Sequence, residues 1–398
     1  MVGAYIISKK GGGLASFISV VKELLLDIYS LTPGAREKEF YREVFFNCRL
    51  RVGSSNDPML PIVLKRQTRK YGYDLVIHVP PGLSAMSFIK RKAELEHAFD
   101  AEIEIEAIGN QNILLRVFPF PIPEKIDYAK PELPKEMALP VLIGYSRAGM
   151  IIEDLAQFPH LCVAGETFGG KSTFLRQALV TLKLERPETG IYIIDMKRLE
   201  FSFFAKHSWY AYTMPEAIRL LEYLHKEMYD RLALLDKAMC VNIQEYHQRG
   251  GMLPYCVLAL DEFSQLCPEL AKNDKDKDDR KYAHSMLVDL VCLARAVGIH
   301  VIICTQRPDY KVLPGQLKAN IPAALCFRVK NGVNSDIVLD NTRAAYLPRI
   351  RGRAIWQFDR EIEVQVPWLT TAQAREMLQR VPERAVAQEE QKAEILPF

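Results

Sequence analysis

The chain has 398 residues, of which 49% are hydrophobic and 25% charged. This balance excludes collagen-like, mucin-like and wholly disordered proteins, and the length corresponds to two or three domains at roughly 100–200 residues each. Fifty-two Lys and Arg residues against 49 Asp and Glu residues give a net charge of +3, which is too small to indicate a nucleic-acid partner by itself. Any nucleic-acid site must therefore be a local feature.

Residues 1–70 form a basic N-terminal region with twelve Lys or Arg and six Asp or Glu residues. Apolar residues recur at helical spacing over Leu14–Leu31, which predicts an amphipathic helix. Charged residues interrupt this segment, so we expect no intrinsic membrane span and a cytoplasmic protein. The excess of basic residues is typical of a solvated face, and contact with nucleic acid or acidic lipid is the alternative.

Residues 71–120 predict a small α+β domain with the order β-α-β-β. The expected elements are Asp74–Val79, Ser84–Phe99, Ala101–Glu106 and Ile113–Phe118. Gly109 and Asn110 form a typical hairpin turn between the last two strands. Six prolines between residues 119 and 140 favour an extended connector, so we predict a linker at residues 121–138.

Residues 139–370 alternate short apolar strands with helical segments, which is typical of an α/β fold. The expected strands are His160–Ala164, Gly190–Ile194, Cys256–Leu260, His300–Thr305, Ala323–Val329 and Arg353–Gln357. The first four are almost continuously apolar, which predicts a mainly parallel sheet buried on both faces. A C-terminal helix or tail is expected at residues 371–398.

A phosphate-binding motif follows the first of these strands. Residues 165–172 match GxxxxGKS and precede a predicted helix at Thr173–Leu182. In this motif the backbone N–H groups wrap the phosphates, the lysine reaches the β- and γ-phosphates, and the serine holds Mg²⁺. We therefore predict a RecA-like P-loop NTPase core with ATP and Mg²⁺ as cofactors. The expected nucleotide-binding residues are Gly165, Glu166, Thr167, Phe168, Gly169, Gly170, Lys171, Ser172 and Thr173.

Polar residues end two further predicted strands. Asp261 and Glu262 follow four apolar residues at the end of Cys256–Leu260. We expect Asp261 to hold Mg²⁺ with Ser172, and Glu262 to polarise the attacking water as a general base. Gln306 follows the strand His300–Thr305, where a polar side chain can sense the γ-phosphate or orient water.

The order of these motifs resembles that of the FtsK/SpoIIIE-type DNA translocases over roughly residues 139–369. The most specific segment runs from Ala294 to Pro308 and reads ARAVGIHVIICTQRP. The other matching segments are the P-loop, Asp195–Arg198, Leu260–Glu262 and Lys318–Pro322. Structural and catalytic roles are equally open for Asp195 and Lys197, which end the strand Gly190–Ile194.

The resemblance implies a homo-hexameric ring that hydrolyses ATP to pull double-stranded DNA through a central pore. Arg295 matches the arginine that family members extend to the nucleotide of a neighbouring subunit, where it stabilises transition-state charge. Lys318 and Lys330 would then face the pore and contact DNA phosphates, which carry affinity without sequence information. The alternative for both lysines is an ordinary surface position.

About 30 residues follow the matching region, which leaves no room for the family's winged-helix module, and no membrane anchor is evident. By analogy we expect a compact translocase of a conjugative or other mobile element, with a membrane-bound secretion channel or relaxosome proteins as partners. A protein-export ATPase with a related motor is the alternative, and the single P-loop counts against it. A nucleotide-binding module without turnover is a third hypothesis. The charged run at residues 272–281 predicts a solvated loop or a partner contact.

Overall fold

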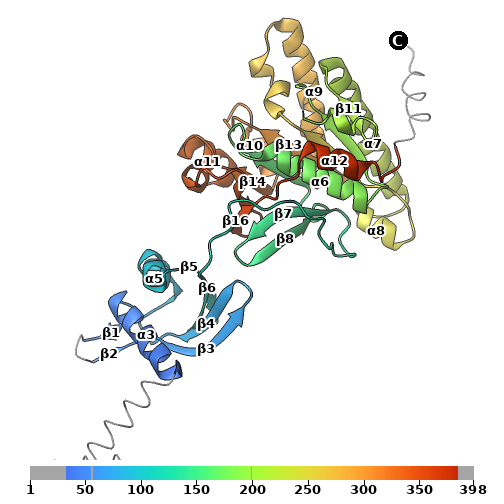
Figure 1. Ribbon diagram of the computed structural model, residues 1–398. Helices are drawn as coiled ribbons and strands as arrows, with labels where there is room; N and C mark the ends of the chain where they lie inside the picture. Colours follow the sequence, from blue (N-terminus) through green and yellow to red (C-terminus); the bar gives the residue numbers. More distant parts are fainter. Residues whose placement is uncertain (1–32, 55–56, 199, 384–398) are drawn as a thin grey trace, which may run out of the picture. The chain divides into compact units, whose positions relative to one another are not determined.

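The computed structural model describes residues 33–54, 57–198 and 200–383 and divides the chain into two compact units. The small unit is Met1–Pro121 and the large unit is Ile122–Phe398 (Figure 1). The amphipathic helix expected at Leu14–Leu31 lies outside the described residues.

The small unit contains a four-stranded antiparallel sheet with helices packed on it. The strand order is β3-β4-β6-β5. The strands are β3 Ile62–Arg69, β4 Gly72–His78, β5 Glu102–Ile108 and β6 Asn112–Phe118, and the helices are α3 Pro33–Asn47, α4 Ala85–Ile89 and α5 Lys92–Phe99. A short β1 Val52–Gly53 pairs with β2 Pro58–Met59. Phe45 of α3 and Phe88 of α4 are fully buried with Leu75 and Leu115 of the sheet.

This unit differs from the prediction at its N-terminal side. The expected boundary at residue 70 falls between β3 and β4, which pair over their whole length. The sequence does not predict strand β3, because it is an edge strand whose residues are nearly all exposed and which therefore shows no apolar alternation. The single helix expected at Ser84–Phe99 is divided into α4 and α5.

The large unit is built on a ten-stranded sheet with the order β11-β10-β12-β13-β9-β14-β15-β16-β7-β8. The strands are β7 Pro140–Ser146, β8 Gly149–Asp154, β9 His160–Ala164, β10 Gly190–Ile194, β11 Trp209–Ala211, β12 Cys256–Leu260, β13 Ile299–Thr305, β14 Ala323–Phe327, β15 Arg353–Gln357 and β16 Glu361–Gln365. The first six in the order pair in parallel, and the rest extend the sheet in antiparallel pairs. The predicted α/β class and mainly parallel sheet are confirmed.

Helices cover both faces of the parallel strands, as Figure 1 shows for α6 and α12 on one side. The helices are α6 Lys171–Glu185, α7 Met214–Lys237, α8 Ile243–Gln248, α9 Asp274–Leu293, α10 Gly315–Ala319, α11 Gly332–Leu339 and α12 Thr371–Leu378. Along β9, Cys162 faces the core beneath α7 and α9, whereas Val163 faces the core beneath α6 and α12. Burial on both faces explains why these strands are continuously apolar.

Two segments expected to be irregular are ordered parts of the large unit. The charged run at residues 272–281 is not a loop but largely the start of α9, where the Asn273 side chain caps the helix by accepting from Asp276 N at 2.9 Å. The expected linker is bound to the large unit, because Trp368 N donates to the carbonyl of Ile126 at 2.7 Å.

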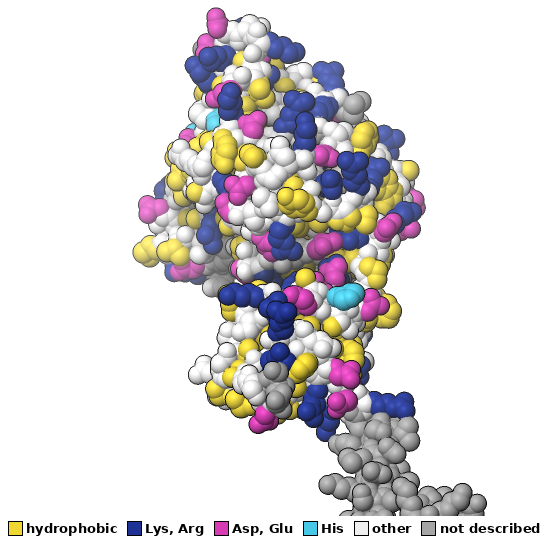
Figure 2. All heavy atoms as spheres, turned by 90° about the vertical axis from the view of Figure 1, so that its left-hand side faces the viewer, with side chains coloured by type: hydrophobic (Ala, Val, Ile, Leu, Met, Phe, Trp, Pro, Cys, Tyr) yellow, Lys and Arg dark blue, Asp and Glu magenta, His cyan; other side chains and the backbone are white. Residues whose placement is uncertain are grey.

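The charged side chains show no separation by sign on the face drawn in Figure 2, where Lys and Arg are interspersed with Asp and Glu. This agrees with the small net charge. Among the described residues, no helix is long and apolar enough to cross a membrane.

Candidate nucleotide-binding and catalytic site

The P-loop and the predicted residues Asp261, Glu262 and Gln306 meet at one edge of the parallel sheet. Strands β9, β12 and β13 are neighbours, with Leu260 in register with Ile303 and Ala164 in register with Thr305. Their carboxyl ends therefore lie together, as parallel pairing requires. The P-loop follows β9, the two acidic residues follow β12 and Gln306 follows β13.

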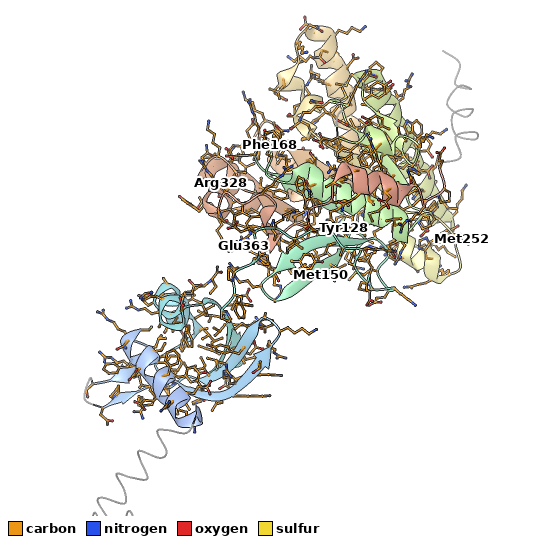
Figure 3. The ribbon with its side chains drawn as sticks, in the orientation of Figure 1. Tyr128, Met150, Phe168, Met252, Arg328 and Glu363 are labelled. Atoms are coloured by element: carbon orange, nitrogen blue, oxygen red, sulfur yellow. The ribbon has the colours of Figure 1, made fainter. Side chains whose placement is uncertain are left out.

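The P-loop backbone depends on two of its glycines. Gly165 has φ +151° and Gly170 has φ +133°, both in the region that favours glycine. A Cβ atom at either position would lie 2.6 Å from an atom of Phe327, closer than a carbon contact allows. Phe168 also has a positive φ of +65° and is 80% exposed, so this aromatic side chain projects from the loop (Figure 3).

Lys171 folds back onto the loop that precedes it. Its Nζ donates to the carbonyl oxygens of Gly165 at 2.6 Å and Glu166 at 2.8 Å. Burial lowers the pKa of this ammonium group, and the nearby carboxylates of Asp261 and Glu262 oppose that shift. The lysine is thus placed inside the loop, where a bound phosphate would become its partner.

Ser172 and Asp261 form the expected metal-binding pair. The hydroxyl of Ser172 donates to Oδ1 of Asp261 at 3.4 Å. Burial, followed by the charge of Asp195, raises the pKa of Asp261 to about 6. A hydroxyl beside a buried carboxylate that lies among other acids fits a magnesium ion, because oxygen ligands suit this cation and its charge would relieve the repulsion.

Glu262 is half-buried and held by several donors. Its Oε1 accepts from the hydroxyl of Ser264 at 2.8 Å, the backbone N of Gln306 at 3.3 Å and the hydroxyl of Thr305 at 3.4 Å. Lys197 Nζ lies 3.5 Å from Oε2 of the same carboxylate. These contacts fix the direction of the carboxylate, as a residue that activates a water molecule requires.

Gln306 bridges the P-loop and the Glu262 carboxylate. Its backbone contacts Glu262, while its side-chain Oε1 accepts from the hydroxyl of Thr167 at 3.1 Å. The backbone N of Glu166 donates to the carbonyl of Arg328, which follows β14, at 3.0 Å (Figure 3). The loop is therefore connected to the strands on both of its sides.

Asp195 anchors the turn after β10. It is fully buried, and its carboxylate accepts from the backbone N of Lys197, the backbone N of Phe201 and the hydroxyl of Tyr210 at 3.0–3.2 Å. These contacts hold the backbone of the turn. Lys197 is the member of the pair that reaches the Glu262 carboxylate.

An open cleft of about 510 Å³ begins at the P-loop, and Gln306 is part of its lining. The lining also includes six residues that no sequence motif had indicated: Arg176, Glu200, Arg351, Trp368, Thr370 and Thr371. They come from helix α6, the loops after β10, before β15 and after β16, and the start of α12. Arg351 belongs to a basic stretch visible in the sequence (Arg343, Arg349, Arg351 and Arg353), but nothing there connects it to the P-loop.

Three predicted residues do not join this site. Arg295 is exposed and precedes β13, so it lies at the opposite edge of the sheet from the P-loop. Lys318 lies before β14 and pairs with Asp340 at 2.7 Å, whereas the exposed Lys330 lies after β14. Within one chain the two lysines are therefore at opposite ends of a strand.

Comparisons with known proteins agree with these features. Residues 131–257 match the model of the FtsK/SpoIIIE family. The DNA translocase FtsK of Treponema pallidum is 33% identical over 225 residues, and that of Chlorobaculum tepidum is 32% identical over 229 residues. Each alignment covers 53% of this chain and 27% of the relative, so the chain spans about a quarter of the length of these relatives.

Solved structures extend the likeness beyond the matched segment. The pCW3 conjugation coupling protein TcpA, solved with ATPγS, is 26% identical with a TM-score of 0.63, and the match covers 86% of this chain and 99% of the solved TcpA chain. The cytoplasmic domain of the type VII secretion ATPase EccC of Thermomonospora curvata shares the fold at 21% identity and a TM-score of 0.52, over 63% of this chain and 32% of the solved EccC chain. The large unit is therefore similar to the P-loop ATPase domains of the FtsK/SpoIIIE family, as the motifs predicted.

Proposed function

We propose that this protein is an ATP-driven DNA translocase that couples DNA transfer by a mobile element to a secretion channel. The observation that carries the proposal is the match to the solved chain of a conjugation coupling protein over nearly all of that chain, together with the P-loop, Asp261, Glu262 and Gln306 at one sheet edge. The proposed assembly is a homo-hexameric ring around double-stranded DNA, located in the cytoplasm and reaching the membrane through its partners.

In the proposed reaction the phosphates of ATP take the place of the loop carbonyls as partners of Lys171. Ser172 and Asp261 would hold Mg²⁺, which neutralises charge on the phosphates when bound. Glu262 accepts a proton from the attacking water, and its contacts with Ser264 and Thr305 keep the carboxylate oriented. Gln306 links the P-loop to Glu262, so the two can respond together to the γ-phosphate.

Arg295 is proposed to act on the nucleotide of a neighbouring subunit. It lies at the sheet edge opposite its own P-loop, so its side chain is far from the nucleotide site of its own chain. An exposed guanidinium without a partner among the described residues is free to enter another subunit's site. Such an arginine can contribute about 10³–10⁵ in rate.

Lys318 and Lys330 are proposed to contact DNA phosphates in the assembled ring. Lys330 is exposed, whereas Lys318 would exchange its ion pair with Asp340 for a phosphate. Exposed ion pairs contribute only about 0–1 kcal/mol, so this exchange costs little. Phosphate contacts suit a motor that must move along any sequence.

The test is the steady-state ATPase rate with and without linear double-stranded DNA, at low and moderate salt, with Lys171→Ala as the control. A translocase requires a large DNA-dependent increase that weakens as salt rises. A rate independent of DNA at both salt concentrations would refute DNA translocation. It would favour the alternative, a protein-export ATPase, whose fold the EccC match shares.

A further inference from the structure

Arg351 and Trp368 form a flat, positively charged surface in the cleft beside the P-loop, which we call the platform. The guanidinium carbon of Arg351 lies 3.9 Å from the ring centroid of Trp368, so the guanidinium rests on the indole face. Both residues line the cleft that also contains Lys171, Ser172 and Thr173. Arg351 is exposed, and within the described part of the chain no carboxylate pairs with it. Its outer face is therefore available to a ligand in the cleft.

The backbone on either side of the platform is fixed. Trp368 N donates to the carbonyl of Ile126 at 2.7 Å, and the carbonyl of Trp368 accepts from Tyr128 N at 3.0 Å. The carbonyl of Arg351 accepts from the side chain of Gln365 at 2.7 Å. A stacking surface held in this way needs little ordering when a ligand binds, which favours affinity.

The platform is also tied to the helix that begins with the P-loop lysine. Arg176, on α6, donates from Nη1 to the carbonyl of Leu369 at 2.8 Å and from Nη2 to Glu200 at 3.0 Å. Arg176 is 7% exposed, and its Nε has no hydrogen-bond partner in the structure. Its ion pair places the Glu200 carboxylate on the wall of the cleft, where a carboxylate can accept hydrogen bonds from hydroxyl groups.

We propose that this part of the cleft binds the nucleoside of ATP, with the base stacked on the guanidinium of Arg351 and the ribose beside Glu200. The inference rests on the proposed nucleotide binding. A base and a guanidinium are both flat and delocalised, and such stacking is a known mode of base recognition. In the strand order β12-β13-β9-β14-β15, Glu262 follows β12 and Arg351 precedes β15, so the two lie on opposite sides of the P-loop after β9. The base must lie on the side of Arg351 if the γ-phosphate faces Glu262.

The competing explanation is that Arg351 contacts a phosphate through its charge. The two explanations are separated by a ligand that has phosphates but no base. We would measure the dissociation constants of ADP and of inorganic tripolyphosphate, both with Mg²⁺, by calorimetry for the full chain and its variants. Arg351→Ala removes stacking and charge, whereas Arg351→Lys keeps the charge and removes the planar group. Arg349→Ala is the matched control, because Arg349 is exposed in the same basic stretch and does not line the cleft.

Both Arg351 variants should weaken ADP binding by about five- to 150-fold, the range that corresponds to the loss of one stacked base. Tripolyphosphate binding should change less than about twofold, and Arg349→Ala should alter neither ligand. Wild-type affinity for ADP in Arg351→Lys, or equal losses for ADP and tripolyphosphate in Arg351→Ala, would overturn the base site. Failure of the wild-type chain to bind either ligand would instead refute the proposed function, and the base site with it.

Discussion

The backbone N of Gln306 donates to Oε1 of Glu262 at 3.3 Å. The two residues follow neighbouring parallel strands, and the side chain of Gln306 also contacts Thr167 in the P-loop. A shift of the P-loop on nucleotide binding can therefore reach the carboxylate through a single residue. This connection places Glu262 at the centre of the first prediction.

Glu262→Gln should abolish most turnover while leaving nucleotide binding intact. The amide has nearly the same shape as the carboxylate, but it cannot take up a proton from water. General-base catalysis contributes about 10²–10⁴ in rate, so the ATPase rate should fall by a factor in this range. The measurement is the ATPase rate at saturating DNA beside the dissociation constant of ADP.

Ser264→Ala serves as the companion variant. It removes the donor that lies 2.8 Å from the same carboxylate oxygen but leaves the carboxylate itself in place. Its rate should lie between wild type and Glu262→Gln. Wild-type turnover in Glu262→Gln would remove Glu262 from the role of base.

Lys171→Ala should abolish ATP turnover and weaken nucleotide binding without unfolding the protein. Among the described residues, the hydrogen bonds of the Lys171 side chain go to the carbonyls of Gly165 and Glu166 in the loop, so its loss should not disturb the hydrogen bonds of the sheet. Lys183→Ala is a matched control, because Lys183 lies on the same helix and donates to the carbonyls of Pro187 and Thr189. Turnover should persist in Lys183→Ala. Binding of ADP at wild-type affinity by Lys171→Ala would contradict the role given to the P-loop lysine.

The sequence predicts the central strands closely because their environment leaves a clear pattern. Strands β9, β10 and β12 have the expected bounds, since burial on both faces demands continuous apolar residues. The antiparallel strands β8 and β16 carry no such pattern. Strand β8, for example, is exposed or half-buried along most of its length and ends in the buried Asp154, so its pairing with β7 identifies it as a strand.

The catalytic part of the site was predictable because each residue directly follows a recognisable strand or motif. The other end of the cleft was not, because Arg351 and Trp368 belong to separate loops that the chain brings together over the sheet. A single arginine and a single tryptophan 17 positions apart have no local signature. The position of Trp368 beside Arg351 depends on its backbone hydrogen bonds with residues 126–128, and no pattern in the sequence predicts these bonds.

Arg295→Ala should lose turnover but retain nucleotide binding, because the residue lies at the sheet edge opposite its own P-loop. In a ring, a subunit carrying Lys171→Ala still offers Arg295 to its neighbour, whose own site is intact. Mixtures of the two inactive variants should therefore recover part of the ATPase activity. The measurement is the rate across a series of mixing ratios, after joint unfolding and refolding so that subunits exchange.

Arg249→Ala is the control for the loss of an arginine. Arg249 pairs with Glu245, four residues before it in the same chain. This variant should keep wild-type turnover alone and in mixtures. Absence of recovery at every ratio of Arg295→Ala to Lys171→Ala, in rings shown to contain both variants, would refute the action of Arg295 on a neighbouring subunit.

Two buried histidines should make the large unit less stable in acid. Burial lowers the pKa of His160 to about 3 and that of His300 to about 4, and the Nε2 atom of each has no hydrogen-bond partner in the structure. The unfolded chain binds protons at these residues near pH 6.5, whereas the folded chain does not, so stability falls as the pH drops below 6.5. Each histidine should cost on the order of 2 kcal/mol between pH 7.5 and 5.

Asp261 opposes this trend, because its raised pKa of about 6 lets the folded state bind a proton that the unfolded state still lacks at pH 5. The effect of Asp261 on stability cancels when wild type is compared with His300→Asn, since both proteins contain Asp261. The asparagine amide can replace the donor that Nδ1 of His300 gives to the carbonyl of Pro159 at 2.9 Å. Urea unfolding followed by tryptophan fluorescence reports the large unit, which contains all three tryptophans. An unchanged loss of stability between pH 7.5 and 5 in His300→Asn would show that the buried imidazole is not its source.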